Sequence, residues 1–187
     1  MDQPYEVEVK IATPSAAVIR KKLRDAGFAI RSSRQFEHNV VLDDARSRLR
    51  KSGLLLRLRL AGRKILCTYK GPAHPGLHKR RIEQEFYADS LPACLAVFEG
   101  LGFSPRFRYE KYRTEFARAG EPGYATLDET PVGIFMELEG PARWIDATAK
   151  ALGFSRADYI TASYADLYFA WCKEHGIKPT HMTFEQA

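Results

Sequence analysis

Alternating apolar and polar residues cover much of the chain, and this two-residue period is typical of short β-strands with one buried face. Eight segments show the period or a composition rich in strand-forming residues: 5–12, 36–42, 54–60, 64–70, 80–87, 106–116, 124–128 and 134–139. A short gap holding Gly62 separates the third segment from the fourth, which predicts a tight hairpin.

Four other segments carry apolar residues at helical spacing: 14–26, 90–100, 141–152 and 158–175. Pro14 is a good first residue for a helix, and Gly27 is a stop signal directly after the first of these segments. From residue 177 onward there is no periodicity, so we expect the tail to fray.

On the predicted strands, charged side chains gather on one face. Glu6, Glu8 and Lys10 share a face because alternate side chains of a strand point to opposite sides. The same split groups charges on the later strands: Arg57, Arg59, Lys64, Lys70, Arg81, Glu83, Glu85, Lys111, Arg113, Glu115, Glu137 and Glu139.

A solvated sheet face is the simpler interpretation, and for any single strand it is the commoner one. Two observations favour a charged interior instead. The polar positions are nearly all full charges, where a solvated face would mix in Ser, Thr and Gln. The helices also carry apolar stripes that need the apolar strand faces for packing. We therefore predict an α+β fold, an eight-stranded antiparallel β-barrel with helices packed on the outside and room inside for one small ligand.

Composition excludes several classes of protein. The 187 residues are 45% hydrophobic and 28% charged, which argues against disorder and makes one domain the default. No stretch approaches the roughly 18 apolar residues of a membrane helix, and Met1 to Pro4 lack signal-peptide features. Three cysteines without a C-x-x-C pair argue against a zinc or disulfide framework. We expect a soluble cytoplasmic protein, whose net charge of +6 permits a polyanionic partner.

The charges assigned to the interior indicate a ligand class. Carboxylates from different strands offer oxygen ligands for Mg²⁺ or Mn²⁺; these are Glu6, Glu8, Asp128, Glu137 and Glu139. Basic side chains suit a dense anion, because arginine binds phosphate oxygens in pairs; these are Lys10, Arg57, Arg59, Lys70, Lys111 and Arg113. Six cations exceed the need of one monophosphate, so a metal-bound triphosphate is the better match.

The segment from Glu6 to Lys10 resembles the E-x-E-x-K signature of the CYTH superfamily, also called triphosphate tunnel metalloenzymes. That superfamily includes class IV adenylyl cyclases, thiamine triphosphatases, inorganic triphosphatases and fungal RNA triphosphatases. Similar elements follow in the family's order: Asn39 to Asp43, Leu56-Arg57-Leu58-Arg59, Thr68-Tyr69-Lys70-Gly71-Pro72, Arg81-Ile82-Glu83-Gln84-Glu85, Lys111-Tyr112-Arg113, Asp128, Phe135-Met136-Glu137-Leu138-Glu139 and Ser163-Tyr164. The resemblance spans residues 4 to 170 and implies an eight-stranded tunnel. We expect a single CYTH-like domain over 1–187, with a core at 4–175 and a tail at 176–187.

The resemblance also implies roles for the charged residues. It makes Glu6, Glu8 and Glu139 metal ligands, with Glu137 and Asp128 as alternative or supporting ligands. It makes the six cations the triphosphate cradle: Lys10, Arg57, Arg59, Lys70, Lys111 and Arg113. Glu83, Glu85 and Lys111 are the candidate catalytic residues. Glu83 and Glu85 would hold a second metal or orient the nucleophile, and pairing with interior cations is an equally good interpretation.

The predicted activity is metal-dependent hydrolysis of a triphosphate, either inorganic triphosphate, ATP or a similar compound. Hydrolysis is favoured because it needs no nucleoside pocket, and the sequence shows none. Tyr69, Phe107 and Tyr109 at the tunnel mouth could stack a base, although helix packing is the commoner role for such residues. Class IV adenylyl cyclase and a non-catalytic polyphosphate or nucleotide binder remain as alternatives. The expected partners exclude duplex nucleic acid and membranes, and a homodimer is left open.

Overall fold

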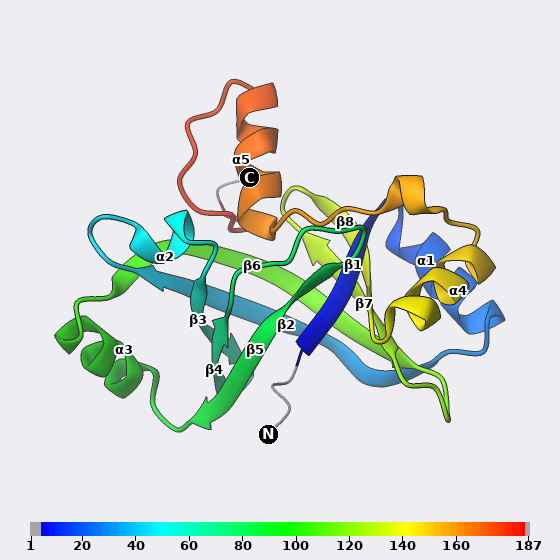
Figure 1. The fold of residues 1–187 in the computed structure, drawn as a ribbon, viewed down its shortest axis with the longest axis horizontal. Coiled ribbons are helices and arrows are strands. Elements are labelled where there is room, and N and C mark those ends of the chain that lie inside the picture. The colour runs from blue at the N-terminus through cyan, green and yellow to red at the C-terminus, as the bar shows by residue number, and fades with distance from the viewer. Residues whose placement is uncertain (1–4, 186–187) are drawn as a thin grey trace.

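A closed antiparallel barrel of eight strands forms the centre of the computed structural model, which describes residues 5–185. Around the barrel the strand order is β1-β5-β4-β3-β2-β6-β7-β8, and β8 pairs back with β1 (Figure 1). The strands are β1 Tyr5–Thr13, β2 Ala29–Asp43, β3 Leu55–Ala61, β4 Lys64–Lys70, β5 Lys79–Ala88, β6 Ser104–Ala117, β7 Tyr124–Thr130 and β8 Gly133–Glu139. The predicted α+β fold with an eight-stranded antiparallel barrel is confirmed.

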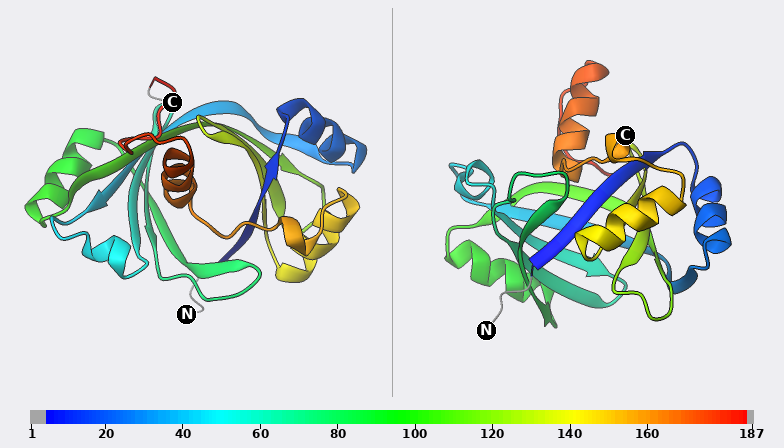
Figure 2. Two further views of the ribbon diagram at one scale, coloured as in Figure 1. Left: turned by 90° about the horizontal axis from the view of Figure 1, so that it is seen from above. Right: turned by 45° about the vertical axis from the view of Figure 1, so that its right-hand side comes forward.

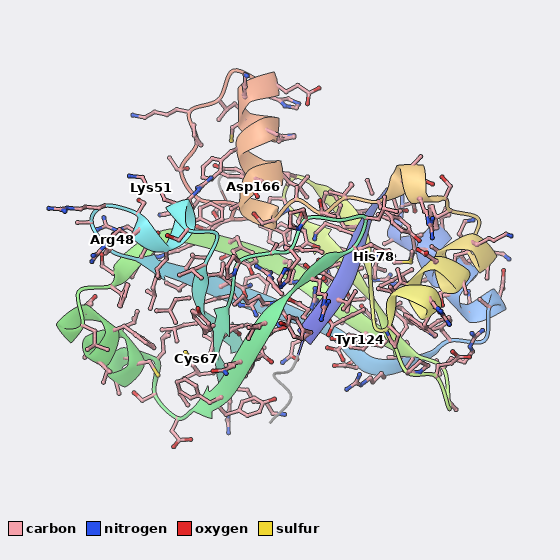
Figure 3. All side chains as sticks on the ribbon, in the orientation of Figure 1. Arg48, Lys51, Cys67, His78, Tyr124 and Asp166 are labelled. Carbon is pink, nitrogen blue, oxygen red and sulfur yellow. The ribbon has the colours of Figure 1, made fainter. Side chains whose placement is uncertain are left out.

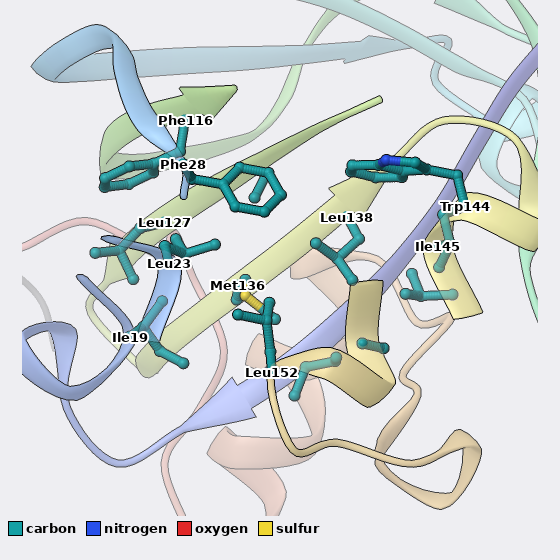
Figure 4. Packing of buried hydrophobic residues seen from close by; sticks show 14 residues of the cluster. Ile19, Leu23, Phe28, Phe116, Leu127, Met136, Leu138, Trp144, Ile145 and Leu152 are labelled. Atoms are coloured by element: carbon teal, nitrogen blue, oxygen red, sulfur yellow. The ribbon is translucent and has the colours of Figure 1, made fainter. Parts of the chain in front are cut away.

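Helices α1 Ala16–Asp25, α3 Leu91–Gly100 and α4 Ala142–Ala151 pack on the outside of the barrel, where the apolar strand faces are. The other helical segments are α2 Arg48–Lys51, the 3-10 turn η1 Arg156–Asp158 and α5 Tyr164–Glu174. The largest core cluster joins α1 and α4 to the outer faces of β1, β7 and β8 (Figure 4). A second cluster places α3 against β2, β3 and β4. No helix of the described chain is long and apolar enough to span a bilayer.

Helix α5 has a different position, because it stands over one end of the barrel (Figure 2). A capping box starts the helix, in which Ser163 Oγ accepts from the Asp166 amide and the Asp166 carboxylate accepts from the Ser163 amide. Tyr164 and Tyr168 then pack with Phe107 and Tyr109 of β6. This end of the barrel is therefore walled by helix as well as strand.

Strand β2 and helix α2 differ from the sequence prediction. β2 begins at Ala29, seven residues before the predicted start at Phe36. Its early part pairs with β6 through irregular register and lacks β3 on its other side, and its side chains are mostly exposed. The four-residue α2 was not predicted, because one helical turn is too short to show a period.

The prediction of a fraying tail is wrong for the described residues after 176. Met182 is fully buried, and its backbone bonds to Arg108 and Glu110 of β6. The amide of Thr180 also donates to the Tyr168 hydroxyl at 3.1 Å. The tail thus ties the end of α5 to the barrel. The predictions for Met1 to Pro4 and for residues 186–187 lie outside the described residues.

Candidate active site

The interior of the barrel holds a cavity of about 620 Å³. Its walls include most of the predicted site residues, which project inward from β1, β3, β4, β6 and β8: Glu6, Glu8, Lys10, Arg57, Arg59, Lys70, Lys111, Arg113, Glu137 and Glu139. Figure 3 shows the side chains on the ribbon and labels Arg48 and Lys51 of α2 and Asp166 of α5, on two elements that contribute to the cavity wall. The two-residue period therefore predicted the inward face correctly, since the opposite faces carry the core clusters.

Asp128 does not line the cavity. Its carboxylate lies behind the cavity wall and binds basic side chains that do line the cavity. It is fully buried on β7 and accepts from Lys111 Nζ at 2.7 Å. Arg113 donates to both of its carboxylate oxygens, at 2.7 and 2.6 Å, and the Tyr164 hydroxyl donates at 2.6 Å. Arg113 also bonds Glu137, which forms an ion pair with Lys10 at 2.9 Å. Two basic side chains that face the cavity are thus held in fixed positions from β7.

Glu6, Glu8 and Glu139 lie on the strands where β1 pairs with β8 and β5. Glu8 lies opposite both Glu139 and Lys79 in the strand register, and Lys79 Nζ is 3.1 Å from its Oε1. Glu6 forms ion pairs with Lys70 at 2.6 Å and with Arg81 at 3.2 Å. Lysine or arginine therefore balances both carboxylates of β1.

Glu139 is the carboxylate of this group with the least compensation. Burial, together with the negative charges of Glu6 and Glu8, raises its pKa to about 7, although Tyr124 donates a hydrogen bond to it. For Glu8, burial acts in the same direction, but the charges of Lys10, Lys79 and Lys70 together outweigh burial and lower the pKa of Glu8 to about 2. Crowded carboxylates of this kind favour a nearby cation.

The donor chemistry of Glu6, Glu8 and Glu139 fits a hard divalent cation, which prefers oxygen ligands. Within residues 5–185, however, no three side chains of His, Cys, Asp or Glu are gathered as a metal site. The ion pairs of Glu6 with Lys70 and of Glu8 with Lys79 account for this arrangement. A bound cation would have to compete with these lysines.

Arg57 and Glu37 lie on neighbouring strands of the opposite wall. Arg57 donates to the Tyr109 hydroxyl at 3.1 Å and to Thr68 at 2.9 Å, while its buried Nε has no hydrogen-bond partner among the described residues. Glu37 is buried between Arg59, at 3.3 Å, and Lys111, at 3.6 Å. Burial opposes its ionisation, but Lys111 and Arg59 outweigh burial and lower the pKa of Glu37 to about 2.

The prediction omitted three of these interior residues as site residues. Glu37 shares the inward face of β2 with Asn39, so strand parity, the alternation of inward and outward residues along a strand, would have identified it. Lys79 and Arg81 share a face with Glu83 on β5, but Lys79 lies one residue before the predicted strand. The ion pairs that they form depend on register between strands, which the sequence does not reveal.

Glu83 and Glu85 are not cavity-lining residues. Glu83 is 2.9 Å from Lys70, and Glu85 accepts from Thr68 at 2.7 Å and lies 3.6 Å from Arg57. Both residues therefore have the contacts expected for pairing with interior cations, which is the second of the two interpretations given for them in the sequence analysis. Among the aromatic residues placed at the mouth, Phe107 and Tyr109 line the cavity and Tyr69 does not.

Comparison with known proteins places the chain in a family. The sequence model of the CYTH domain matches residues 4–164. The chain belongs to the CYTH domain family. A relative from Methanocaldococcus jannaschii named "Putative adenylate cyclase MJ0240" is 25% identical over 173 residues, covering 87% of this chain and 97% of the relative.

Solved structures share the same CYTH fold. A "putative adenylate cyclase" from Vibrio parahaemolyticus superposes with a TM-score of 0.77 at 20% identity, covering 89% of this chain and 98% of its own. A Hippeastrum protein, described as a "putative adenylyl cyclase" that "reveals a dominant" triphosphatase activity, has a TM-score of 0.62 at 20% identity and covers 93% of this chain and 97% of its own. At these identities the likeness concerns the fold alone.

Proposed function

We propose that this CYTH protein is a metal-dependent enzyme that hydrolyses a triphosphate bound inside the barrel. The observation that carries the proposal is the composition of the cavity wall, where cations from β1, β3, β4 and β6 face carboxylates from β1 and β8. A charged lumen is costly unless its charges are paired with each other or with a ligand. The unpartnered Nε of Arg57 supports an anionic ligand, because it is a buried donor without a partner among the described residues.

Mg²⁺ or Mn²⁺ is the proposed cofactor, with Glu6, Glu8 and Glu139 as its ligands and Glu137 as an alternative ligand. When bound, such an ion would neutralise charge on phosphate oxygens. Asp128 is proposed to position basic residues and not to bind the metal, because its carboxylate already accepts hydrogen bonds from Lys111, Arg113 and Tyr164.

The basic residues would bind and orient the phosphates, which is the main requirement of phosphoryl transfer. Arg57 and Arg59 approach the cavity from β3, and Lys111 and Arg113 approach it from β6. Asp128 fixes the last two, so their positive charges need no rearrangement as negative charge develops. Lys10, paired with Glu137, completes the cradle. Glu83 and Glu85 would act by holding Lys70 and Arg57 in place.

Adenylyl cyclase activity is the second candidate, and the names of the relatives favour it. Several similar proteins are named putative adenylate cyclases, whereas the Hippeastrum protein is described as having a dominant triphosphatase activity. Both reactions can use the same cradle of cations. They differ in the nucleophile, which is water in hydrolysis and the ribose 3′-hydroxyl in cyclisation.

Product analysis tests the proposal. The purified protein is incubated with ATP or inorganic triphosphate and with Mg²⁺ or Mn²⁺, and phosphate, pyrophosphate and cyclic AMP are quantified. Phosphate release supports the proposed hydrolysis. Formation of cyclic AMP and pyrophosphate would instead show that the protein is a cyclase. Glu8→Gln should abolish turnover, and Glu129→Gln on the outer surface serves as the matched control. If the protein binds ATP and inorganic triphosphate but forms no product, the interpretation as a non-catalytic binder is the one that remains.

A further inference from the structure

Strand β5 has an outer face that none of the described helices covers. Lys79 and Arg81 of this strand line the cavity, so the alternate positions face outward: Arg80, Ile82, Gln84, Phe86 and Ala88. The three hydrophobic clusters of residues 5–185 include residues of each of the other seven strands and no residue of β5. In Figure 1, β5 crosses the front of the barrel without a helix in front of it.

Apolar side chains on this uncovered face are open to solvent. Phe86 is 56% exposed, and Ile82 is half-buried. The neighbouring strands add two tyrosines, because Tyr5 of β1 lies opposite Ile82 and Tyr69 of β4 lies opposite Gln84. These tyrosines are 43% and 40% exposed. Exposed apolar surface gathered in one place marks an interaction site. We call the surface formed by Tyr5, Tyr69, Arg80, Ile82, Gln84 and Phe86 the β5 face.

The sequence along β5 is symmetric about Gln84. Ile82 and Phe86 lie two residues to either side of it, and exposed charges of opposite sign lie beyond them, Arg80 before and Asp89 after. At about 3.3 Å per residue, Arg80 is about 13 Å and Asp89 about 16 Å from Gln84 along the chain. If the strand packs antiparallel against its own copy, apolar residues therefore meet apolar residues and each arginine meets an aspartate.

Charge also distinguishes a second copy from other partners. The chain has a net charge of +6, so two copies repel each other over most of their surface. On the β5 face the charge of Arg80 is balanced by Asp89, and neither residue forms an ion pair within residues 5–185. A two-fold contact uses the same patch on both subunits, and the order of charges on this patch is complementary to its own reverse.

We propose that the protein forms a homodimer through the β5 face, with the two-fold axis at Gln84. Phe86 then packs against Ile82 of the second copy, and Arg80 pairs with Asp89 of the second copy. Packed sheets keep their strands within about 30° of each other, an offset that the long arginine side chain spans. Lys79 and Arg81 point to the opposite side of β5, so this contact does not depend on the proposed hydrolysis.

Sedimentation velocity over a concentration series in the micromolar range tests the dimer, and we expect the wild type to dimerise. Phe86→Glu places a carboxylate in the apolar contact of both copies. It should weaken dimerisation at least about 100-fold, the loss expected when an aromatic anchor is removed from both sides. Val97→Glu is the matched control, because Val97 lies on α3, is 63% exposed and does not belong to the β5 face.

A charge exchange tests the orientation of the two copies. Arg80→Asp and Asp89→Arg should each weaken dimerisation about 10-fold, because each creates two contacts between like charges. The double variant Arg80→Asp/Asp89→Arg restores opposite charges at both contacts and should return to within about 3-fold of the wild type. Such a recovery requires that the two residues meet across the interface.

Crosslinking tests the position of the axis. Gln84→Cys places one thiol of each copy beside the axis, so a short bismaleimide should join them into a covalent dimer. Val97→Cys should give no more covalent dimer than the wild type, whose half-buried Cys94 sets the background.

The inference is overturned if the wild type is a monomer throughout the series. It is also overturned if Phe86→Glu and the single charge variants dimerise as the wild type does, or if Val97→Glu alone breaks the dimer, because the contact then lies on another face. If circular dichroism shows that Phe86→Glu does not fold, the charge exchange decides: recovery in the double variant supports the β5 face, and failure to recover overturns it.

Discussion

Asp128→Asn should destabilise the protein strongly, because it removes one negative charge from a fully buried network. The carboxylate accepts four hydrogen bonds, from Lys111, Arg113 twice and Tyr164. After the substitution Arg113 keeps Glu137, but the nearest remaining carboxylate to Lys111 among the described ion pairs belongs to Glu37, at 3.6 Å. One buried cation is therefore left with little compensation.

Removing one partner of a buried ion pair costs about 3–5 kcal/mol. For a chain of this size, each kcal/mol lowers the melting temperature by about 2–4 °C, so a fall of roughly 6–20 °C is expected. The assay is urea unfolding followed by the fluorescence of Trp144 and Trp171. Glu129→Gln is the matched control, since Glu129 pairs with Arg20 and Arg34 at the surface. Exposed pairs of that kind contribute about 0–1 kcal/mol.

The reasoning would be refuted if Asp128→Asn lay within about 1 kcal/mol of the Glu129→Gln control. Such a result would mean that water inside the barrel screens the charges of the lumen. A second readout is stabilisation by inorganic tripolyphosphate. The anion should raise the melting temperature of Asp128→Asn more than that of the wild type, because it replaces the missing negative charge.

Three further predictions concern other parts of the molecule. Burial opposes ionisation of Tyr109, but the charges of Arg57, Lys111 and Arg59 together outweigh burial and lower the pKa of Tyr109 to about 8. An ultraviolet titration should show one such tyrosine, lost in Tyr109→Phe. Because this folded pKa lies below the ordinary value of 10.0, the resulting stability is present above pH 10 and is lost as the pH falls through about 8. Met182→Ala should lower the free energy of unfolding by about 2–5 kcal/mol, since the side chain is fully buried, and an unchanged urea midpoint would contradict the packing described for the tail. Gly123→Ala should destabilise by at least about 1–3 kcal/mol, because its new Cβ would lie 2.4 Å from a Trp144 ring atom, whereas Gly100→Ala meets nothing within 4 Å and should be neutral or slightly stabilising in the same urea assay.

Strand parity explains why the lumen was predictable from sequence. A residue such as Lys10 or Arg57 faces inward because its neighbours on both sides pack outward against helices, and that alternation is visible in the chain. The same parity places Leu55 on the inward face, but a leucine among leucines gives no signal of its own. The place of Leu55 in the cavity wall therefore became visible only in the structure.

The pairing of charges could not be predicted, because it depends on contacts between distant strands. Glu8 lies beside Lys79 only through the register of β1 with β5, and parity alone would equally allow other cations. Met182 illustrates the same limit for the tail. Its segment has no periodic pattern, and it is ordered by two backbone bonds to β6 and by burial under α5 rather than by local propensity.

Pairing of β1 with β8 has a consequence for the order in which the molecule forms. These strands are the first and the last of the barrel along the chain, and their contact brings Glu8 opposite Glu139. Contacts so remote along the chain form slowly, because a long loop must close before they contribute. During synthesis, Glu6 and Glu8 of β1 leave the ribosome before β8, so the pairing of β1 with β8 forms only after the intervening chain has been made. The carboxylates of the lumen are therefore assembled last, and a nascent chain that lacks β8 has an open sheet edge on β1 for a chaperone to protect.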